Sequence, residues 1–238
     1  MFDQTDTEAK LETAVTASIE RIKEWDLYVI SDLELAGGKS YPEIFESVLR
    51  SGVRVMQLRD KETPFEDLVL LGRRLMKMCR QFEAQLIIND NPYLAKEIDA
   101  DGVHLGQLDC PVEIARDIVG REKIVGVSTH NVAQALKAQM SDADYIAIGP
   151  IFETQTKRAA GGALGATMVR WAREHLKKPF VCIGGIQQHN IRELMEQGAR
   201  CCAVISAVMG APDMQLAASN LRAMIREHLP VETFDASE

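Results

Sequence analysis

Eight short apolar runs alternate with longer amphipathic stretches along this chain, and this alternation restricts the folds that it can adopt. Apolar runs of about four to eight residues that are bounded by turn residues are typical of buried strands. The predicted strands cover residues 26–31, 53–59, 85–89, 102–105, 123–127, 144–149, 180–184 and 201–205.

Each predicted strand is followed by a stretch with the apolar spacing of a helix. These helices cover residues 41–51, 91–98, 111–119, 131–139, 165–176, 188–197 and 214–228, and one more opens at residue 63. Buried strands joined by helical crossovers form a parallel sheet, and eight such units in about 200 residues indicate an α/β protein with a closed (β/α)8 barrel, the TIM barrel. A doubly wound open sheet is the alternative, but residues 31–34 lack the glycine-rich fingerprint that it needs after the first strand.

The predicted barrel is one domain over residues 26–230, because no linker or shift of composition divides it. An N-terminal extension, residues 1–25, comes before it. Helical spacing of apolar residues from about residue 9 to residue 25 predicts an added helix, whose role we expect to be packing or assembly. Residues 231–238 form a C-terminal tail.

The net charge of -8 and the pI near 5.3 argue against a general nucleic-acid or anionic-membrane surface. Any phosphate site must therefore be a local basic pocket. The five cysteines form no Cys-x-x-Cys pair, which argues against a disulfide framework or a zinc site and is typical of a reducing compartment. The chain shows neither a signal-peptide pattern nor an apolar run of about 18 residues, so we expect a cytoplasmic protein.

Two aspartates mark the ends of neighbouring predicted strands. Asp90 follows the third strand and Asp109 follows the fourth, so parallel pairing brings both carboxylates to the same edge of the barrel. Carboxylate oxygens beside substrate phosphates suit Mg²⁺. The alternative is that each aspartate merely caps the helix that follows it.

The second strand ends in polar residues at alternating positions. Gln57, Arg59 and Lys61 should point the same way, into the barrel mouth. Two inward cations in an acidic protein need a partner, and a diphosphate is one candidate. Internal ion pairs with Asp60 or Asp90 are the alternative.

Later strand ends carry further groups that suit phosphate. Ser128 follows the fifth strand, where its hydroxyl either bonds a phosphate oxygen or caps the helix at Asn131. Hydroxyls and an amine follow the sixth strand at Thr154, Gln155, Thr156 and Lys157, and Gly185 and Ser206 follow the seventh and eighth. No Ser-His-Asp set or close glutamate pair stands out, so a transfer reaction driven by departure of a metal-bound diphosphate fits this set of residues.

These motifs together resemble the thiamine-phosphate synthase family. The resemblance covers roughly residues 26–210, in order and at barrel spacing, and rests on the segments 57–61, 89–90, 106–109, 126–130, 154–157, 184–186 and 204–206. It implies a transferase that joins a hydroxymethylpyrimidine diphosphate to a thiazole phosphate, giving thiamine phosphate and diphosphate. In this family the pyrimidine is thought to leave as a stabilised cation that the thiazole nitrogen captures.

The resemblance also implies a role for each matching residue. Asp90 and Asp109 would hold Mg²⁺, while Arg59, Lys61, Ser128 and Lys157 would be the catalytic groups around the diphosphate. The remaining contacts would come from Gln57, Leu58, Asp60 and Asn89 for the pyrimidine diphosphate, and from Thr154, Gln155, Thr156, Gly185, Ile205 and Ser206 for the thiazole phosphate.

One departure from the family pattern is Glu153, which stands where the family usually has proline. This change affects loop stiffness rather than a ligand. The alternatives on the same barrel are a thiazole tautomerase-like protein, a non-catalytic sensor of thiamine precursors and a generic phosphate-binding isomerase. The expected partners are small-molecule substrates, and the oligomeric state, a homo-oligomer included, is left open.

Overall fold

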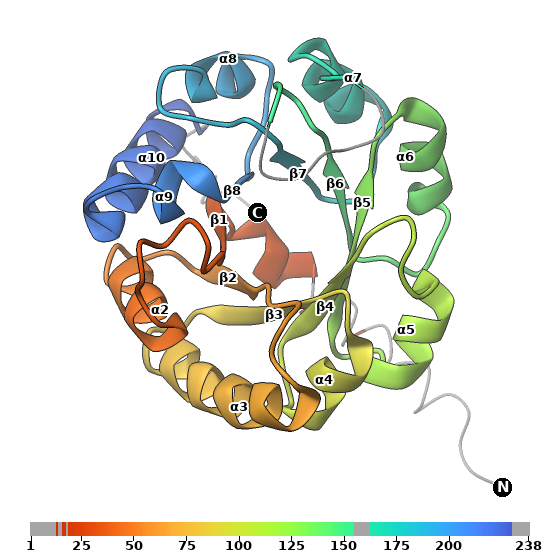
Figure 1. Cartoon of the computed structure of the whole chain (residues 1–238). Coiled ribbons are helices and arrows are strands. Elements are labelled where there is room, and N and C mark those ends of the chain that lie inside the picture. The colour runs from red at the N-terminus through yellow and green to blue at the C-terminus, as the bar shows by residue number, and fades with distance from the viewer. Residues whose placement is uncertain (1–12, 14–15, 18, 155–161, 230–238) are drawn as a thin grey trace, which may run out of the picture.

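Eight parallel strands close into a barrel in the order β1 to β8 in the computed structural model, which describes residues 13, 16, 17, 19–154 and 162–229. Helices surround the barrel on the outside (Figure 1). The predicted (β/α)8 barrel is confirmed, and the doubly wound alternative is wrong because β1 pairs with both β2 and β8.

All eight predicted strands are present, with ends that differ by no more than a few residues. Their bounds are β1 Leu27–Ile30, β2 Val55–Leu58, β3 Gln85–Asn89, β4 Gly102–Leu105, β5 Ile124–Thr129, β6 Tyr145–Ile148, β7 Phe180–Ile183 and β8 Cys202–Val204.

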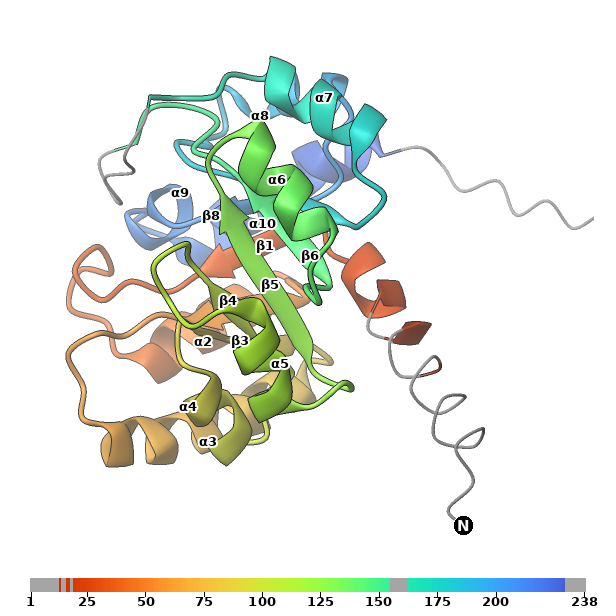
Figure 2. The same ribbon diagram turned by 90° about the vertical axis from the view of Figure 1, so that its right-hand side faces the viewer.

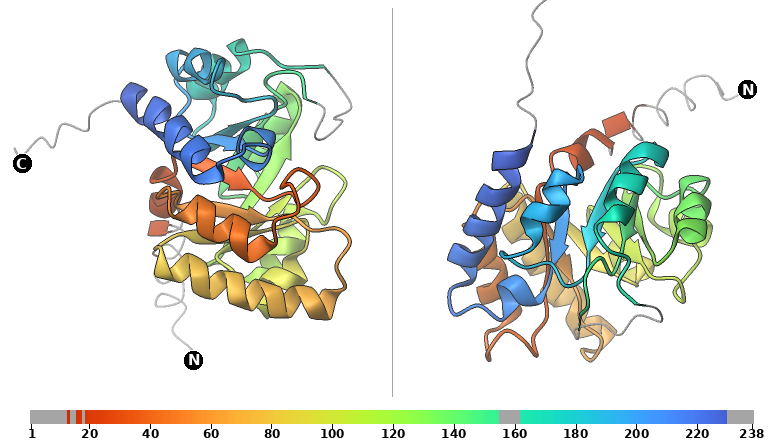
Figure 3. Two further views of the ribbon diagram at one scale, coloured as in Figure 1. Left: turned by 60° about the vertical axis from the view of Figure 1, so that its left-hand side comes forward. Right: turned by 90° about the horizontal axis from the view of Figure 1, so that it is seen from above.

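The helices follow the predicted order, with one addition. Their bounds are α2 Tyr41–Leu49, α3 Phe65–Gln81, α4 Pro92–Glu97, α5 Val112–Val119, α6 Val132–Gln139, α7 Thr167–His175, α8 Ile191–Glu196, α9 Ser206–Met209 and α10 Met214–His228. The short helix α9 directly after β8 was not predicted. Helix α10 contacts α8 and α2, which closes the ring of helices around the sheet (Figure 3). Within the described part of the chain, no helix is long and apolar enough to cross a membrane.

The core has two layers because successive strand residues face opposite sides of the sheet. In β1, Leu27 and Val29 pack toward the helices, whereas Tyr28 and Ile30 face the barrel interior. The inner layer is therefore filled by side chains rather than open, as in other barrels of this size.

The N-terminal segment packs against the barrel at the end where the strands begin, which we call the N-terminal end (Figure 2). Residues 13, 16, 17 and 19–23 are helical. Ile22 and Trp25 are buried in the inner layer, and the Trp25 indole lies 5.3 Å from the ring of Tyr28 and 5.2 Å from that of Tyr145. Its Nε1 donates to Oε1 of Gln85 at 2.5 Å. These contacts cover the N-terminal end of the barrel interior.

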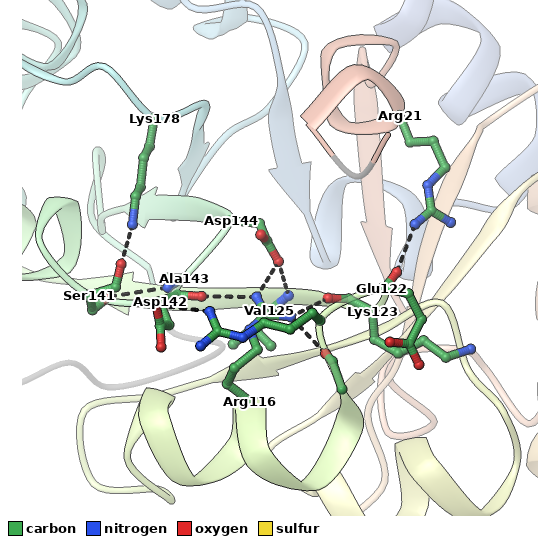
Figure 4. A network of polar contacts seen from close by, with 12 residues as sticks. Arg21, Arg116, Glu122, Lys123, Val125, Ser141, Asp142, Ala143, Asp144 and Lys178 are labelled. Atoms are coloured by element: carbon green, nitrogen blue, oxygen red, sulfur yellow. Dashed lines mark hydrogen bonds and ion pairs between the residues drawn. The ribbon is translucent and has the colours of Figure 1, made fainter. Parts of the chain in front are cut away.

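A buried ion pair between Arg116 and Asp144 ties α5 to the starts of β5 and β6 (Figure 4). Arg116 Nη2 lies 2.6 Å from Asp144 Oδ2, which also accepts the backbone N–H of Val125 at 2.7 Å. The guanidinium donates further to the carbonyls of Gly120, Lys123 and Asp142. Because its charge and most of its donors are matched, the pair is a structural connection.

Candidate active site

A cavity of about 510 Å³ lies at the opposite end of the barrel, where the strands finish. The loops after six consecutive strands, β3 to β8, contribute to its lining, together with Lys61 from the loop after β2. The lining includes eight of the residues selected from the sequence, which are Lys61, Asp90, Asp109, Ser128, Thr154, Gly185, Ile205 and Ser206.

Asp90 and Asp109 do not cap the helices that follow them. Asn91 caps α4, since its side chain accepts the N–H of Leu94 at 3.0 Å, and Asp90 stands just before it in a left-handed conformation with φ 64°. Pro111 precedes α5, and Asp109 instead accepts the N–H of Gly106 at 2.7 Å within its own loop. The helix-cap alternative is therefore wrong for both residues.

The donor chemistry of these two carboxylates fits a magnesium ion. Both face the same cavity as Lys61, whose Nζ lies 3.7 Å from Asp90 Oδ2. The described residues contain no group of three or more His, Cys, Asp and Glu side chains arranged for a metal, so a full protein cage is not found there. Mg²⁺ commonly takes only one or two carboxylates and completes its shell with phosphate and water oxygens.

Arg59 is paired with a carboxylate that the sequence did not single out. Its Nη1 donates to Asp32 Oδ2 at 2.8 Å, and the guanidinium does not line the cavity. The register explains the pairing. Ile30 of β1 lies beside Gln57 of β2. Asp32 and Arg59, each two positions further along, are therefore also neighbours. Of the two predicted internal ion pairs, the one between Lys61 and Asp90 is present.

Four other residues proposed for the pyrimidine diphosphate also lie outside the cavity lining, namely Gln57, Leu58, Asp60 and Asn89. The Leu58 side chain packs toward the helices, and that of Gln57 is buried in the barrel interior. Asp60 accepts the N–H groups of Glu62 and Thr63 and the hydroxyl of Thr63. Partial burial raises the pKa of Asp60, but these hydrogen bonds outweigh it and hold the pKa below its ordinary value.

The loops after β6, β7 and β8 meet on the other side of the cavity. Gly184 and Gly185 have φ angles of 102° and 64°, and a Cβ on Gly185 would lie 2.4 Å from the carbonyl oxygen of Glu153. Glycine is thus required by backbone conformation and by packing of two loops. Ser206 opens α9 and accepts a hydrogen bond from Gln187 Nε2 at 3.1 Å. Gln155, Thr156 and Lys157 lie outside the described residues.

Three polar residues beneath the cavity were not predicted to be near the site. Tyr28, His104 and Tyr145 sit within apolar runs and are buried in the barrel interior. His104 Nε2 lies 2.8 Å from the hydroxyl of Ser128, and its Nδ1 lies 2.8 Å from the hydroxyl of Tyr145. Each lies at an inward-facing position of its own strand, and the alternation of side chains along a strand is the only sequence signal that could have identified them.

His130 lines the cavity but its ring is held by the backbone. Its Nδ1 lies 2.7 Å from the carbonyl oxygen of Gly149, and its own N–H donates to the side chain of Gln134. Asn131 caps α6 by accepting the N–H of Gln134, so Ser128 is not the helix cap that the sequence left open.

Comparisons with known proteins give the family and support the fold. A family model described as thiamine monophosphate synthase matches residues 27–208. Thiamine-phosphate synthase from Lawsonia intracellularis is 40% identical over 200 residues, which span 84% of this chain and 92% of that protein. The corresponding protein from Chloroflexus aurantiacus is 41% identical over 208 residues, or 87% of this chain and 96% of the relative. The solved structure of thiamine phosphate pyrophosphorylase from Pyrococcus furiosus superposes with a TM-score of 0.80 at 36% identity, covering 88% of this chain and 99% of that one.

Proposed function

The chain belongs to the thiamine monophosphate synthase family, and we propose that it joins a hydroxymethylpyrimidine diphosphate to a thiazole phosphate, giving thiamine phosphate and diphosphate. One structural observation supports the proposal. Carboxylates and an amine from the loops after β2, β3 and β4 share a single cavity with the glycine and hydroxyl groups after β6, β7 and β8. The cavity thus offers one region for each phosphorylated substrate.

The first region would bind the diphosphate. Lys61 and Ser128 supply donors to its oxygens, and Asp90 and Asp109 would hold Mg²⁺, which when bound neutralises charge on the leaving diphosphate. Arg59 keeps its proposed role because Asp32 takes a bond from Nη1 alone, and a guanidinium has five N–H donors. Lys157 is proposed here from the sequence alone.

The pyrimidine ring would lie between this region and the barrel interior. Gln57 is proposed as its contact from within the barrel, with Leu58, Asp60 and Asn89 shaping the strand ends around it. Since Leu58 packs toward the helices, its contribution would come from its backbone.

The second region would bind the thiazole phosphate through Thr154, Gly185, Ile205 and Ser206, with Gln155 and Thr156 proposed from the sequence.

In the reaction, the bond between the pyrimidine methylene carbon and the diphosphate oxygen breaks, and the diphosphate takes the electron pair. The thiazole nitrogen then donates its lone pair to that carbon. This nitrogen carries no proton, so the residues need to position substrates and stabilise charge rather than remove a proton.

Diphosphate release from the purified protein tests this function. The assay combines hydroxymethylpyrimidine diphosphate, thiazole phosphate and Mg²⁺, and then omits each in turn. We expect release only with all three, with thiamine phosphate as the product. Absence of release while thiazole phosphate still binds would instead favour the tautomerase-like or sensor role. The five free thiols further support the proposal of a cytoplasmic enzyme.

A further inference from the structure

Five buried polar side chains form a continuous hydrogen-bonded chain through the barrel interior, ending at the cavity. Gln57 Nε2 lies 2.7 Å from the hydroxyl of Tyr28, which lies 3.3 Å from the hydroxyl of Tyr145. Tyr145 in turn lies 2.8 Å from His104 Nδ1, and His104 Nε2 lies 2.8 Å from the hydroxyl of Ser128. None of the five residues is more than 9% exposed.

One order of donors along these five side chains gives the hydrogen of each buried tyrosine hydroxyl an acceptor among them. The Gln57 amide nitrogen can only donate, so the Tyr28 hydroxyl accepts from it. In the order that leaves no tyrosine hydrogen unpaired, the Tyr28 hydroxyl then donates to that of Tyr145. The Tyr145 hydroxyl therefore directs its hydrogen to His104 Nδ1. Burial raises the pKa of Tyr28 and of Tyr145 well above the ordinary value, so both hydroxyls keep their hydrogens at neutral pH.

We propose that this relay holds His104 with its proton on Nε2, and so turns the hydroxyl hydrogen of Ser128 into the cavity as a donor to an anionic substrate oxygen. Ser128 has one hydrogen. Because its oxygen accepts from His104 Nε2, that hydrogen is available in the direction of the cavity that Ser128 lines. His104 is thus a positioning residue, and the identity of the anion as the diphosphate rests on the proposed function.

Gly126 makes the relay geometrically feasible. It lies on β5 between His104 of β4 and Tyr145 of β6 in the strand register. A Cβ at this position would lie 2.0 Å from Cζ of Tyr145 and 2.5 Å from its hydroxyl. The missing side chain therefore leaves the space through which the Tyr145 ring reaches His104, whose ring stacks against it at a centroid distance of 5.5 Å.

Nitrogen-15 NMR of histidine-labelled protein tests the tautomer directly, without ligand and independently of turnover. The His104→Gln variant identifies the His104 signals among the five histidines. We expect the wild-type protein to carry the proton on Nε2, and Tyr145→Phe to lose this preference. Tyr93→Phe is the matched control, because that hydroxyl is on an exposed ring of α4. A proton on Nδ1 in the wild type would make His104 the donor to Tyr145 and Ser128 the donor to His104 Nε2, and would overturn the proposal.

Binding of inorganic diphosphate in the presence of Mg²⁺ then tests the role of Ser128 by calorimetry. We expect Ser128→Ala to weaken binding about tenfold, since hydrogen bonds to charged acceptors are among the stronger ones. Tyr145→Phe should weaken it roughly threefold in the wild type and not at all in the Ser128→Ala background, because both act through one hydroxyl. Additive effects would overturn the proposal. If the Nε2 tautomer is found but substrates are not turned over, the relay stands and the proposed function fails.

Discussion

Aspartates at the two ends of the barrel have the same side chain but opposite surroundings. At the N-terminal end, Asp26, Asp101 and Asp144 each stand directly before a strand and accept a backbone N–H. Each also lies near an arginine. At the C-terminal end, Asp90 and Asp109 follow strands and face the cavity.

The partners of these aspartates differ between the two ends. Asp26 lies 3.0 Å from Arg222 and 2.6 Å from Arg226, and only 3% of its side chain is exposed. Its charge is matched by two guanidinium groups, whose planar donors hold the carboxylate in place. Asp90 has Lys61 at 3.7 Å, on a flexible side chain that is 53% exposed and can move toward an arriving phosphate. The three aspartates before strands thus have arginine neighbours, whereas Asp90, a proposed metal ligand, has a lysine.

Replacement of Asp90 should have the largest effect. We expect Asp90→Ala to lower Mg²⁺-dependent turnover by about a thousandfold or more, because charge stabilisation of the leaving group is lost. The melting temperature should stay close to that of the wild type, since Asp90 caps no helix. Diphosphate release and thermal unfolding measure the two effects. Asp117→Ala, on the exposed face of α5, is the control, and unchanged activity in Asp90→Ala would rule out the metal assignment.

For Asp144 we expect the opposite pattern, in which stability is lost rather than turnover. Its replacement by alanine leaves the buried Arg116 without a counter-charge, so the free energy of unfolding should fall by about 3–5 kcal/mol. Urea unfolding measures this loss. The double variant Arg116→Met, Asp144→Asn should recover part of it, as the amide oxygen can still accept the N–H of Val125. The comparison of the two ends breaks down if Asp144→Ala keeps its stability and loses turnover instead.

The barrel could be predicted because its signals are local. Each strand is a short apolar run and each helix has its own periodicity, so their order follows directly from the chain. Placement of Asp90 and Asp109 at one edge also followed, because parallel strands deliver their last residues to the same end. The helix α9 escaped prediction because four residues carry no periodic pattern.

The side-chain contacts that were not predicted depend on the register between different strands. The pairing of Arg59 with Asp32 requires knowing that β1 and β2 are aligned at Ile30 and Gln57. The hydrogen bond between His104 and Tyr145 joins β4 to β6 across the space that Gly126 leaves on β5. Taken along the chain, Tyr145 is simply a residue of an apolar run, and nothing local indicates its polar partner.

A smaller effect is expected for Ser206 on the far side of the cavity. Ser206→Ala should raise the KM for the thiazole phosphate roughly threefold to tenfold with little change in kcat, because a ground-state hydrogen bond is lost. Steady-state kinetics with each substrate varied in turn measure the change. Gln187→Ala, which removes the side chain that donates to the Ser206 hydroxyl, should give a weaker version of the same effect. A loss confined to kcat would place Ser206 at the reacting centre instead.

The smallest effect is expected for Asp101, the least tightly paired aspartate of the N-terminal end. Arg21 Nη1 is 3.8 Å away, and burial raises the pKa of Asp101 despite the hydrogen bond from the N–H of Leu86. A folded-state pKa above the unfolded value means that the contribution of Asp101 to stability is present at low pH and is lost as the pH rises through the folded-state pKa. Asp101→Asn should therefore stay within about 1 kcal/mol of the wild type. Its stability relative to the wild type should improve between pH 4 and pH 7 in urea unfolding. A relative stability that worsens with pH would show that Arg21 matches Asp101 as firmly as Arg116 matches Asp144, and the three aspartates would then form one class.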